Sequence, residues 1–218
     1  MYFDGNPVTV IGEISVDDLA ALGVTINRSF DAKWVKRSFN LMEDCYCLKA
    51  LTPSNFDVPN ADTQQELKTL LLPFVEPYVN SDEVLLYMDI SYIPPGKRTK
   101  VHVDHALMHQ FARRLHIPVI TNSAVRFAVF HGSTIKNYHM EVGKVYEVNN
   151  QVMHIAANLG TEPRWHMVID IIDKEIYEYL IRSNRLLSKG LDPSINYTFN
   201  THLVEKLNKA VECEITNE

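Results

Sequence analysis

The segment VHVDH at residues 101–105 has the residue types and the spacing of a metal site. In a strand, alternate side chains share a face, so we expect His102 and Asp104 to point one way and His105 the other. Together they offer one nitrogen and one oxygen donor to a metal ion. With a second histidine they would form the 2-His-1-carboxylate triad, which binds non-haem Fe(II) and leaves positions open for a co-substrate and O₂. Because His-x-Asp alone is a common pattern, this interpretation needs a third ligand.

Residues 149–166 supply a histidine and an arginine that could complete such a site. His154 follows the turn-like pair Asn149-Asn150, and Arg164 begins the next run after a turn at 160–163. We expect these two runs to be antiparallel neighbours, with His154 and Arg164 facing one cavity. An arginine inside a β-barrel needs an anion, because a buried unpaired guanidinium is costly. A ligand carboxylate held by the planar guanidinium would meet this need.

A third polar pair, Arg114 and His116, alternates with Leu115 and Ile117. The alternation predicts that Arg114 and His116 share one strand face and that the two apolar residues share the other. The polar pair would then extend a cation-lined wall that suits acidic small molecules.

Structural interpretations stay open for each of these features. His154 can be a satisfied core histidine, and Arg164 can pair at the surface with Glu162 or Asp170. The third polar pair can lie on a solvated strand edge. The order of three ligands and an anion-binding arginine along one predicted barrel favours the functional interpretation.

The stretch from Glu83 to Asp173 must position these residues. It is rich in β-branched and aromatic residues, and turn signals interrupt it at short intervals. The absence of alternating long helices argues against a parallel sheet and favours a jelly roll or barrel. The expected strands are 84–93, 114–121, 125–131, 144–149 and 164–172.

We expect a single domain over residues 1–218, divided into three zones. Residues 1–82 form an N-terminal mixed α/β flank, residues 83–173 the β core and residues 174–218 the C-terminal helices. The expected flanking strands are 8–14, 34–41 and 46–51, and the expected flanking helices are 16–22, 62–79, 174–187 and 202–213. Pro73 is expected to kink or end the second of these helices.

The composition excludes several classes of protein. Asp+Glu number 27 against 21 Lys+Arg, giving a net charge of −6, which argues against a nucleic-acid partner. Of the three cysteines, two lie in Cys45-Tyr46-Cys47, which makes no disulfide framework, so we expect a reduced, cytoplasmic setting. No run of about 18 apolar residues and no secretion signal are present, so we expect no membrane association.

Together, the motifs resemble those of the aspartyl/asparaginyl β-hydroxylase group of Fe(II)- and 2-oxoglutarate-dependent oxygenases, with a pattern similar to that of L-proline cis-4-hydroxylase. The resemblance runs from about Ile93 to Ile172, and residues 1–80 and those after Asp173 show no such match. It rests on short motifs in the family's order: His102-x-Asp104, Arg114-x-His116, Thr121-Asn122, His139-Met140-x-x-Gly143-Lys144, His154-x-Ala156 and Arg164-x-His166-x-Val168-x-Asp170.

The resemblance implies a cupin-like double-stranded β-helix core and three iron ligands: His102, Asp104 and His154. It also implies that Arg164 holds the distal carboxylate of 2-oxoglutarate. Arg114 and His116 would line the carboxylate pocket of the co-substrate or the substrate, and His166 would orient a neighbour. Because related halogenases lack the acidic ligand, Asp104 favours hydroxylation. The remaining histidines are expected not to bind metal: His105, His109, His131, His139 and His202.

The implied activity is hydroxylation of an unactivated C–H bond in a free amino acid or a peptidyl side chain. Fe(II), 2-oxoglutarate and O₂ would be required, and succinate and CO₂ would be released. One alternative is a non-catalytic β-barrel module that binds an acidic ligand or a protein partner, although such a module has no need for the complete ligand set. A cupin-type metal enzyme without 2-oxoglutarate is disfavoured by Arg164. The flanks are expected to build a substrate lid, and whether they also form a homodimer surface is left open.

Overall fold

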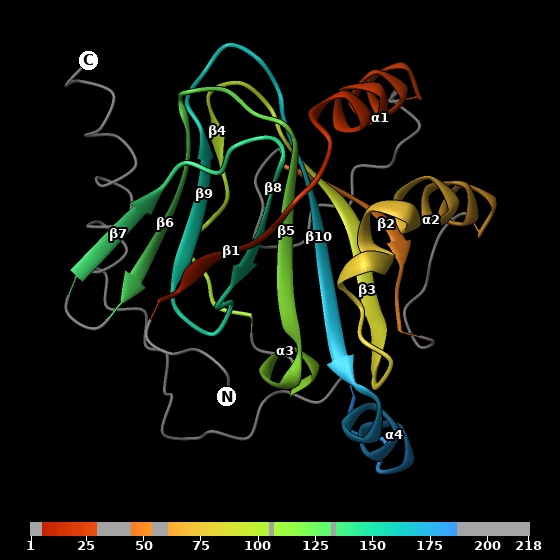
Figure 1. The fold of residues 1–218 in the computed structure, drawn as a ribbon. Coiled ribbons are helices and arrows are strands. Elements are labelled where there is room, and N and C mark those ends of the chain that lie inside the picture. The colour runs from red at the N-terminus through yellow and green to blue at the C-terminus, as the bar shows by residue number, and fades with distance from the viewer. Residues whose placement is uncertain (1–5, 30–44, 54–60, 105–106, 132–133, 187–218) are drawn as a thin grey trace.

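The computed structural model describes residues 6–29, 45–53, 61–104, 107–131 and 134–186 (Figure 1). Six strands form a larger sheet: β1 (Val8–Glu13), β2 (Tyr46–Leu51), β3 (Glu83–Ile93), β5 (Arg113–Ile120), β8 (Lys144–Val148) and β10 (Arg164–Asp173). Four strands form a smaller sheet: β4 (Lys97–Arg98), β6 (Val125–His131), β7 (Thr134–Tyr138) and β9 (His154–Asn158). The helices are α1 (Val16–Ser29), α2 (Ala61–Val75), α3 (Leu107–Phe111) and α4 (Lys174–Arg182), with a 3₁₀ turn at Glu76–Tyr78.

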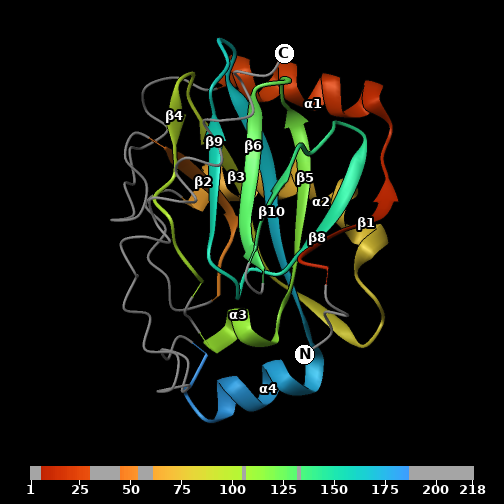
Figure 2. The same ribbon diagram turned by 90° about the vertical axis from the view of Figure 1, so that its left-hand side faces the viewer.

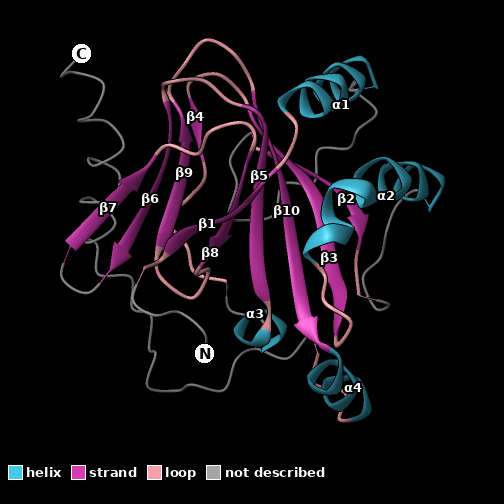
Figure 3. Ribbon diagram, viewed as in Figure 1, coloured by secondary structure: helices cyan, strands magenta, loops and turns pink. Residues whose placement is uncertain are grey.

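The two sheets face each other, and every pairing between the described strands is antiparallel (Figures 1 and 3). The larger sheet has the order β1-β8-β5-β10-β3-β2, and the smaller one the order β4-β9-β6-β7. Strands that are consecutive in the chain therefore often lie in opposite sheets, as in a jelly roll. The predicted mainly β fold with a double-stranded β-helix core and flanking helices is confirmed.

Strand β10 at the centre of the larger sheet shows how the sequence separates two environments. Its odd-numbered residues, including Trp165, Met167 and Ile169, belong to a hydrophobic core on the outer face of the sheet. Because side chains alternate along a strand, the even-numbered residues Arg164 and Asp170 are directed to the space between the sheets. This alternation gives the strand one apolar face and one face that carries polar and charged groups.

Helices α1 and α2 cover the outer face of the larger sheet (Figures 1 and 2). The apolar residues of α1 that enter this core are Leu19, Leu22 and Ile26, and those of α2 are Leu67, Leu71 and Val75. Both sets recur at helical spacing, which gives each helix one apolar stripe to bury. Trp165 also donates from Nε1 to Asn27 Oδ1 at 3.0 Å, which connects α1 to the sheet.

Several boundaries differ from the prediction. The helix expected at 16–22 continues to Ser29, and the helix α3 interrupts a region expected to be entirely β. Helix α2 ends at Val75, two residues after Pro73, and continues only as the 3₁₀ turn at Glu76–Tyr78, so it is shorter than the expected 62–79. The expected strand at 34–41 and the expected helix at 202–213 lie outside the described residues. Within the described ranges, neither Cys45 nor Cys47 is in a disulfide, and no helix is long and apolar enough to cross a membrane.

Candidate active site

His102, Asp104 and His154 come together between the sheets, as the sequence predicted. One donor atom from each lies within 4.8 Å of the other two, and His102 Nε2 is 4.0 Å from Asp104 Oδ1. The two histidines face each other across a β-bridge, in which His102 N donates to His154 O at 3.0 Å and His154 N to His102 O at 2.9 Å. Main-chain hydrogen bonds therefore set the spacing of the two imidazoles.

Both imidazoles present Nε2 to this cluster because Nδ1 is already used. His102 Nδ1 lies 2.7 Å from the carbonyl of Lys100, and His154 Nδ1 lies 2.9 Å from that of Val152. A carbonyl oxygen can only accept, so each Nδ1 carries a proton, and in the neutral ring Nε2 is then the nitrogen that offers a lone pair. Such a contact also fixes the orientation of the ring, as is usual for histidines that bind metals.

The ionisation states also suit a divalent cation. Burial, together with the neighbouring His102, lowers the pKa of His154 to about 3, so this imidazole is neutral at pH 7. Burial opposes the charge on Asp104, but Arg114 and the nearby histidines outweigh it and lower its pKa to about 2. Metal ions bind neutral imidazoles and ionised carboxylates. The donor set therefore fits a 2-His-1-carboxylate iron site.

Arg164 lies on the interior face of β10 and is only 2% exposed. Its guanidinium donates to Ser91 Oγ at 3.3 Å and to His166 Nδ1 at 2.8 Å, while its Nε has no partner among the described residues. Burial lowers its pKa to about 10, which still leaves it charged at pH 7. The surface pairing with Glu162 or Asp170 that the sequence left open is therefore wrong. The part of the chain that the structure describes gives this buried cation no hydrogen-bonded carboxylate.

A row of rings connects Arg164 with the triad. The centroid of His166 lies 6.2 Å from that of His116, which lies 5.6 Å from Phe127, and Phe127 lies 5.4 Å from His154. His116 Nδ1 and His166 Nε2 are buried without a partner among the described residues. Burial lowers the pKa of both histidines, so both rings are neutral. Buried nitrogens without a hydrogen-bond partner among the described residues thus belong to the row of rings that connects the arginine with the three clustered donors.

Arg114 is 8% exposed and lies on β5, a central strand of the larger sheet, so the solvated-edge interpretation is wrong. Its Nε and Nη2 donate to the two oxygens of Asp170, each at 2.7 Å, and its Nη1 donates to Asp104 Oδ2. Leu115 and Ile117 lie on the opposite face, in the core, as predicted. Arg114 is therefore surrounded by carboxylates of the chain itself, unlike Arg164.

Two geometric expectations about these residues were wrong. Residues 101–104 form no regular strand, because His102 pairs through a single bridge only. Strands β9 and β10 are not neighbours: β9 pairs with β4 and β6, whereas β10 pairs with β3 and β5. The connection after Asn158 crosses from one sheet to the other. His154 and Arg164 consequently belong to opposite sheets of the jelly roll.

Sequence reasoning missed two partners of the candidate site. Ser91 on β3 contacts Arg164, and Asp170 on β10 anchors Arg114. The period-two alternation that places Arg164 and His166 on one face also places Asp170 there, so that signal was available. Ser91 had none, because only strand pairing sets β3 beside β10.

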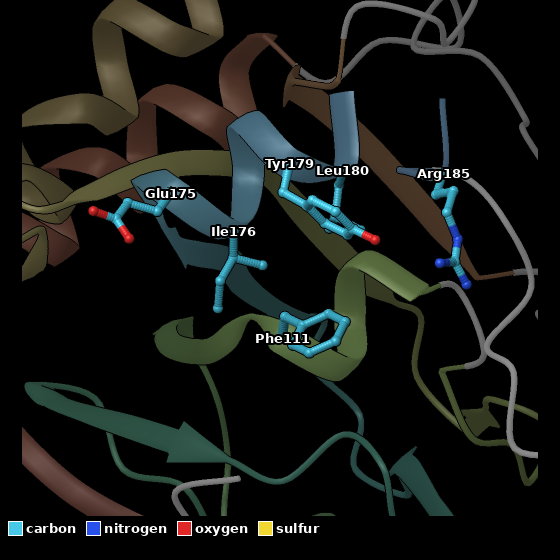
Figure 4. Close-up of a pocket in the computed structure, with 6 residues that line it drawn as sticks. All are labelled: Phe111, Glu175, Ile176, Tyr179, Leu180 and Arg185. Atoms are coloured by element: carbon cyan, nitrogen blue, oxygen red, sulfur yellow. The ribbon is translucent and has the colours of Figure 1, made fainter. Parts of the chain in front are cut away.

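A pocket of about 390 Å³ lies elsewhere, between α3 and α4 (Figure 4). The lining residues are Phe111, Glu175, Ile176, Tyr179, Leu180 and Arg185. None of them belongs to the predicted site. Its lining is mostly apolar and offers no set of metal ligands.

Comparison with known proteins connects this geometry to a family. The sequence profile of aspartyl/asparaginyl β-hydroxylases matches residues 57–174, more than half of the chain. The chain belongs to the aspartyl/asparaginyl β-hydroxylase family. All six predicted site residues lie inside the matched range. A search of curated proteins found no significant match.

Solved structures share the fold of this family member at low sequence identity. HygX from Streptomyces hygroscopicus, with nickel and 2-oxoglutarate bound, has a TM-score of 0.55 and 14% identity over 79% of this chain and 85% of its own. The epimerase SnoN from nogalamycin biosynthesis, described as non-haem and α-ketoglutarate-dependent, has a TM-score of 0.54 and 12% identity over 78% of this chain and 79% of its own. A Pseudomonas putida prolyl-4-hydroxylase has a TM-score of 0.51 and 12% identity over 77% of this chain and 93% of its own. At these identities the likeness concerns the fold.

Proposed function

We propose that this family member is an Fe(II)- and 2-oxoglutarate-dependent dioxygenase. Its predicted reaction is hydroxylation of an unactivated C–H bond in a free amino acid or a peptidyl side chain, with release of succinate and CO₂. The observation that carries the proposal is the combination of a His-Asp-His cluster with a buried arginine that lacks a carboxylate partner among the described residues. The first suits a ferrous ion, and the second suits the free carboxylate of a diacid.

His102, Asp104 and His154 would hold the iron, as the family resemblance implies. Their Nε2 atoms and carboxylate are in the forms that a divalent cation needs, and the Nδ1 contacts keep the rings in place. Arrangement of the three donors before the metal arrives reduces the conformational entropy lost on binding. When bound, iron with 2-oxoglutarate and O₂ supplies the oxidising chemistry that converts a C–H bond to C–OH.

Arg164 would bind the distal carboxylate of 2-oxoglutarate. His166 accepts from its Nη2 and thereby orients the guanidinium. Because Nδ1 of His166 accepts, its Nε2 carries the proton and is a further unused donor. Nδ1 of His116 also lacks a partner among the described residues, and His116 would contact the same co-substrate between Arg164 and the metal ligands.

HygX has 2-oxoglutarate bound and SnoN is described as α-ketoglutarate-dependent, which supports the co-substrate assignment. The prolyl-4-hydroxylase supports hydroxylation. They do not identify the substrate, since related folds carry out different reactions. A non-catalytic β-barrel module would leave the complete donor set without a purpose. The cytoplasmic setting and the absence of a nucleic-acid partner remain predictions from the sequence, and the question of a homodimer stays open.

The test is anaerobic addition of Fe(II) and 2-oxoglutarate, followed by a screen of free amino acids and then peptides for succinate release in air. We expect a weak visible charge-transfer band that disappears in His102→Ala and persists in His131→Ala, a partly exposed histidine outside the cluster. Fully iron-loaded protein that shows neither the band nor succinate release would contradict the proposed dioxygenase activity. Absence of any Fe(II) or Mn(II) affinity would favour the binding module.

A further inference from the structure

Arg114 connects the predicted metal ligand Asp104 to a second, fully buried carboxylate. Two of its nitrogens donate to Asp170 at 2.7 Å each, and the third donates to Asp104 Oδ2. Asp170 is 0% exposed, so bulk solvent does not compensate its charge. The paired contact uses both oxygens of Asp170, the geometry in which a guanidinium is held most rigidly.

Helix α3 adds a further support to this arrangement. His109 Nδ1 lies 2.9 Å from Asp170 Oδ2 and 3.1 Å from Arg114 Nη2. The carbonyl of His109 accepts from Gln151 Nε2 at 2.7 Å, which ties the helix to the turn before His154. The guanidinium of Arg114 is therefore fixed from the side opposite Asp104.

The two oxygens of Asp104 consequently have different surroundings. Oδ2 accepts from Arg114, whereas Oδ1 lies 4.0 Å from His102 Nε2. A carboxylate can bind a metal through one oxygen or both. The hydrogen bond to Oδ2 leaves Oδ1 as the oxygen available to a cation beside the two histidines.

We propose that Arg114 is a positioning residue that keeps Asp104 a one-oxygen metal ligand, in place of the carboxylate-binding role that the family resemblance implies for it. This inference rests on the proposed iron site. Three single-atom ligands leave about half of an octahedron open to other molecules. Binding through both oxygens of Asp104 would remove one of those positions, and the chelating co-substrate would then compete with the protein's own ligand.

The contrast with Arg164 supports this division of roles. All three guanidinium nitrogens of Arg114 already donate to carboxylates of the chain, so a ligand carboxylate would have to displace Asp104 or Asp170 to reach it. Among the described residues, Arg164 donates hydrogen bonds only to a hydroxyl and an imidazole. Of Arg114 and Arg164, only Arg164 has no hydrogen-bonded carboxylate among the described residues, so Arg164 is the better candidate to bind an organic acid.

The experiment uses cobalt(II) as the metal probe and its visible d–d spectrum as the readout, first without any organic acid and then during titration with 2-oxoglutarate. Arg114→Gln removes the contact, and Arg114→Lys keeps the charge but cannot reach three oxygens at once. The matched control is Arg113→Gln, which removes the neighbouring arginine and its contacts to Glu83 and Glu147. Asp170→Asn removes the charge that anchors Arg114. Circular dichroism identifies variants that do not fold.

We expect an altered cobalt spectrum without organic acid in both Arg114 variants and an unchanged one in Arg113→Gln. We also expect 2-oxoglutarate to bind the cobalt form about 10-fold more weakly in Arg114→Gln and Asp170→Asn, the range usual for residues that orient metal ligands. A wild-type spectrum in Arg114→Lys, with tighter 2-oxoglutarate binding in Asp170→Asn, would show that Arg114 binds the acid and would overturn the positioning role alone. Wild-type protein that binds no cobalt would overturn the proposed iron site as well.

Discussion

His102 and His154 form a reciprocal main-chain pair, with N–O distances of 3.0 and 2.9 Å and ring centroids 4.3 Å apart. Neither imidazole contributes a side-chain hydrogen bond to the other. The bridge therefore survives loss of either side chain, and the ligand role of each residue can be separated from its structural role.

Replacement of His102 or His154 by alanine should abolish stabilisation by metal while leaving the fold intact. Divalent metal at 100 times its dissociation constant should stabilise the wild type by about 2.7 kcal/mol, and the variants should gain nothing. Thermal unfolding with and without Mn(II) measures this, with His131→Ala as the control that keeps the gain. Equal stabilisation of wild type and both variants would place the metal elsewhere.

Substitution of Arg164 by methionine should stabilise the protein without ligand and impair binding of 2-oxoglutarate. The guanidinium is 2% exposed, and replacement of poorly compensated buried charge by an apolar side chain of similar size is often stabilising, here by about 1 kcal/mol. The cobalt spectrum without acid should not change, because the hydrogen bonds of Arg164 go to Ser91 and His166 and not to the triad. Urea unfolding and 2-oxoglutarate titration give the two readouts. If Arg164→Met were less stable than the wild type and bound 2-oxoglutarate equally well, both the predicted gain in stability and the predicted loss of binding would be wrong.

Asp173 should be worth about 1 kcal/mol as the N-cap of α4. Its Oδ1 accepts from the backbone N–H groups of Glu175 at 2.8 Å and Ile176 at 3.0 Å. Asp173→Ala loses both contacts, whereas Asp173→Asn keeps an accepting oxygen and should lose much less. Urea unfolding of the three proteins measures the difference. Equal losses in both variants would assign the effect to charge and not to capping.

The sequence was sufficient to identify the three residues that cluster and to assign side chains to the faces of the strands. His102, Asp104 and His154 were found from residue type and order, and the alternation of Arg114 and His116 with Leu115 and Ile117 predicted which side chains enter the core. The strand faces depend on local periodicity, which a sequence records directly, whereas the triad came from residue type, order and the family resemblance.

Long-range pairing was not available in the same way. The crossing between β9 and β10 was expected to be a hairpin, because a short polar turn joins the two runs and nothing local indicates that the chain changes sheet. The contact of Arg114 with Asp170 joins residues 56 positions apart and depends on the register of β5 against β10. Helix α3 is only five residues long, too short for a periodic signal.

Asp89 should make the protein less stable as the pH rises from 4 to 7. The carboxyl is 3% exposed and accepts from the Tyr87 hydroxyl at 2.5 Å, and burial raises its pKa from 3.8 to about 6. Between these two values the folded state binds more protons than the unfolded state, so the free energy of unfolding falls with rising pH. The group's stabilising effect is complete below pH 4 and is lost as the pH passes 6.

Asp89→Asn removes this titration and keeps an oxygen that can accept from Tyr87. Relative to the wild type, its free energy of unfolding should therefore increase between pH 4 and pH 7, by up to about 3 kcal/mol for a shift of this size. Asp104 and Asp170, whose pKa values are lowered, titrate below this range and are common to both proteins, so they cancel in the difference. Urea unfolding of the two proteins at pH 4, 5, 6 and 7 measures it. A difference that stays constant across this range would mean that Asp89 ionises equally in both states, and that the space around it admits water.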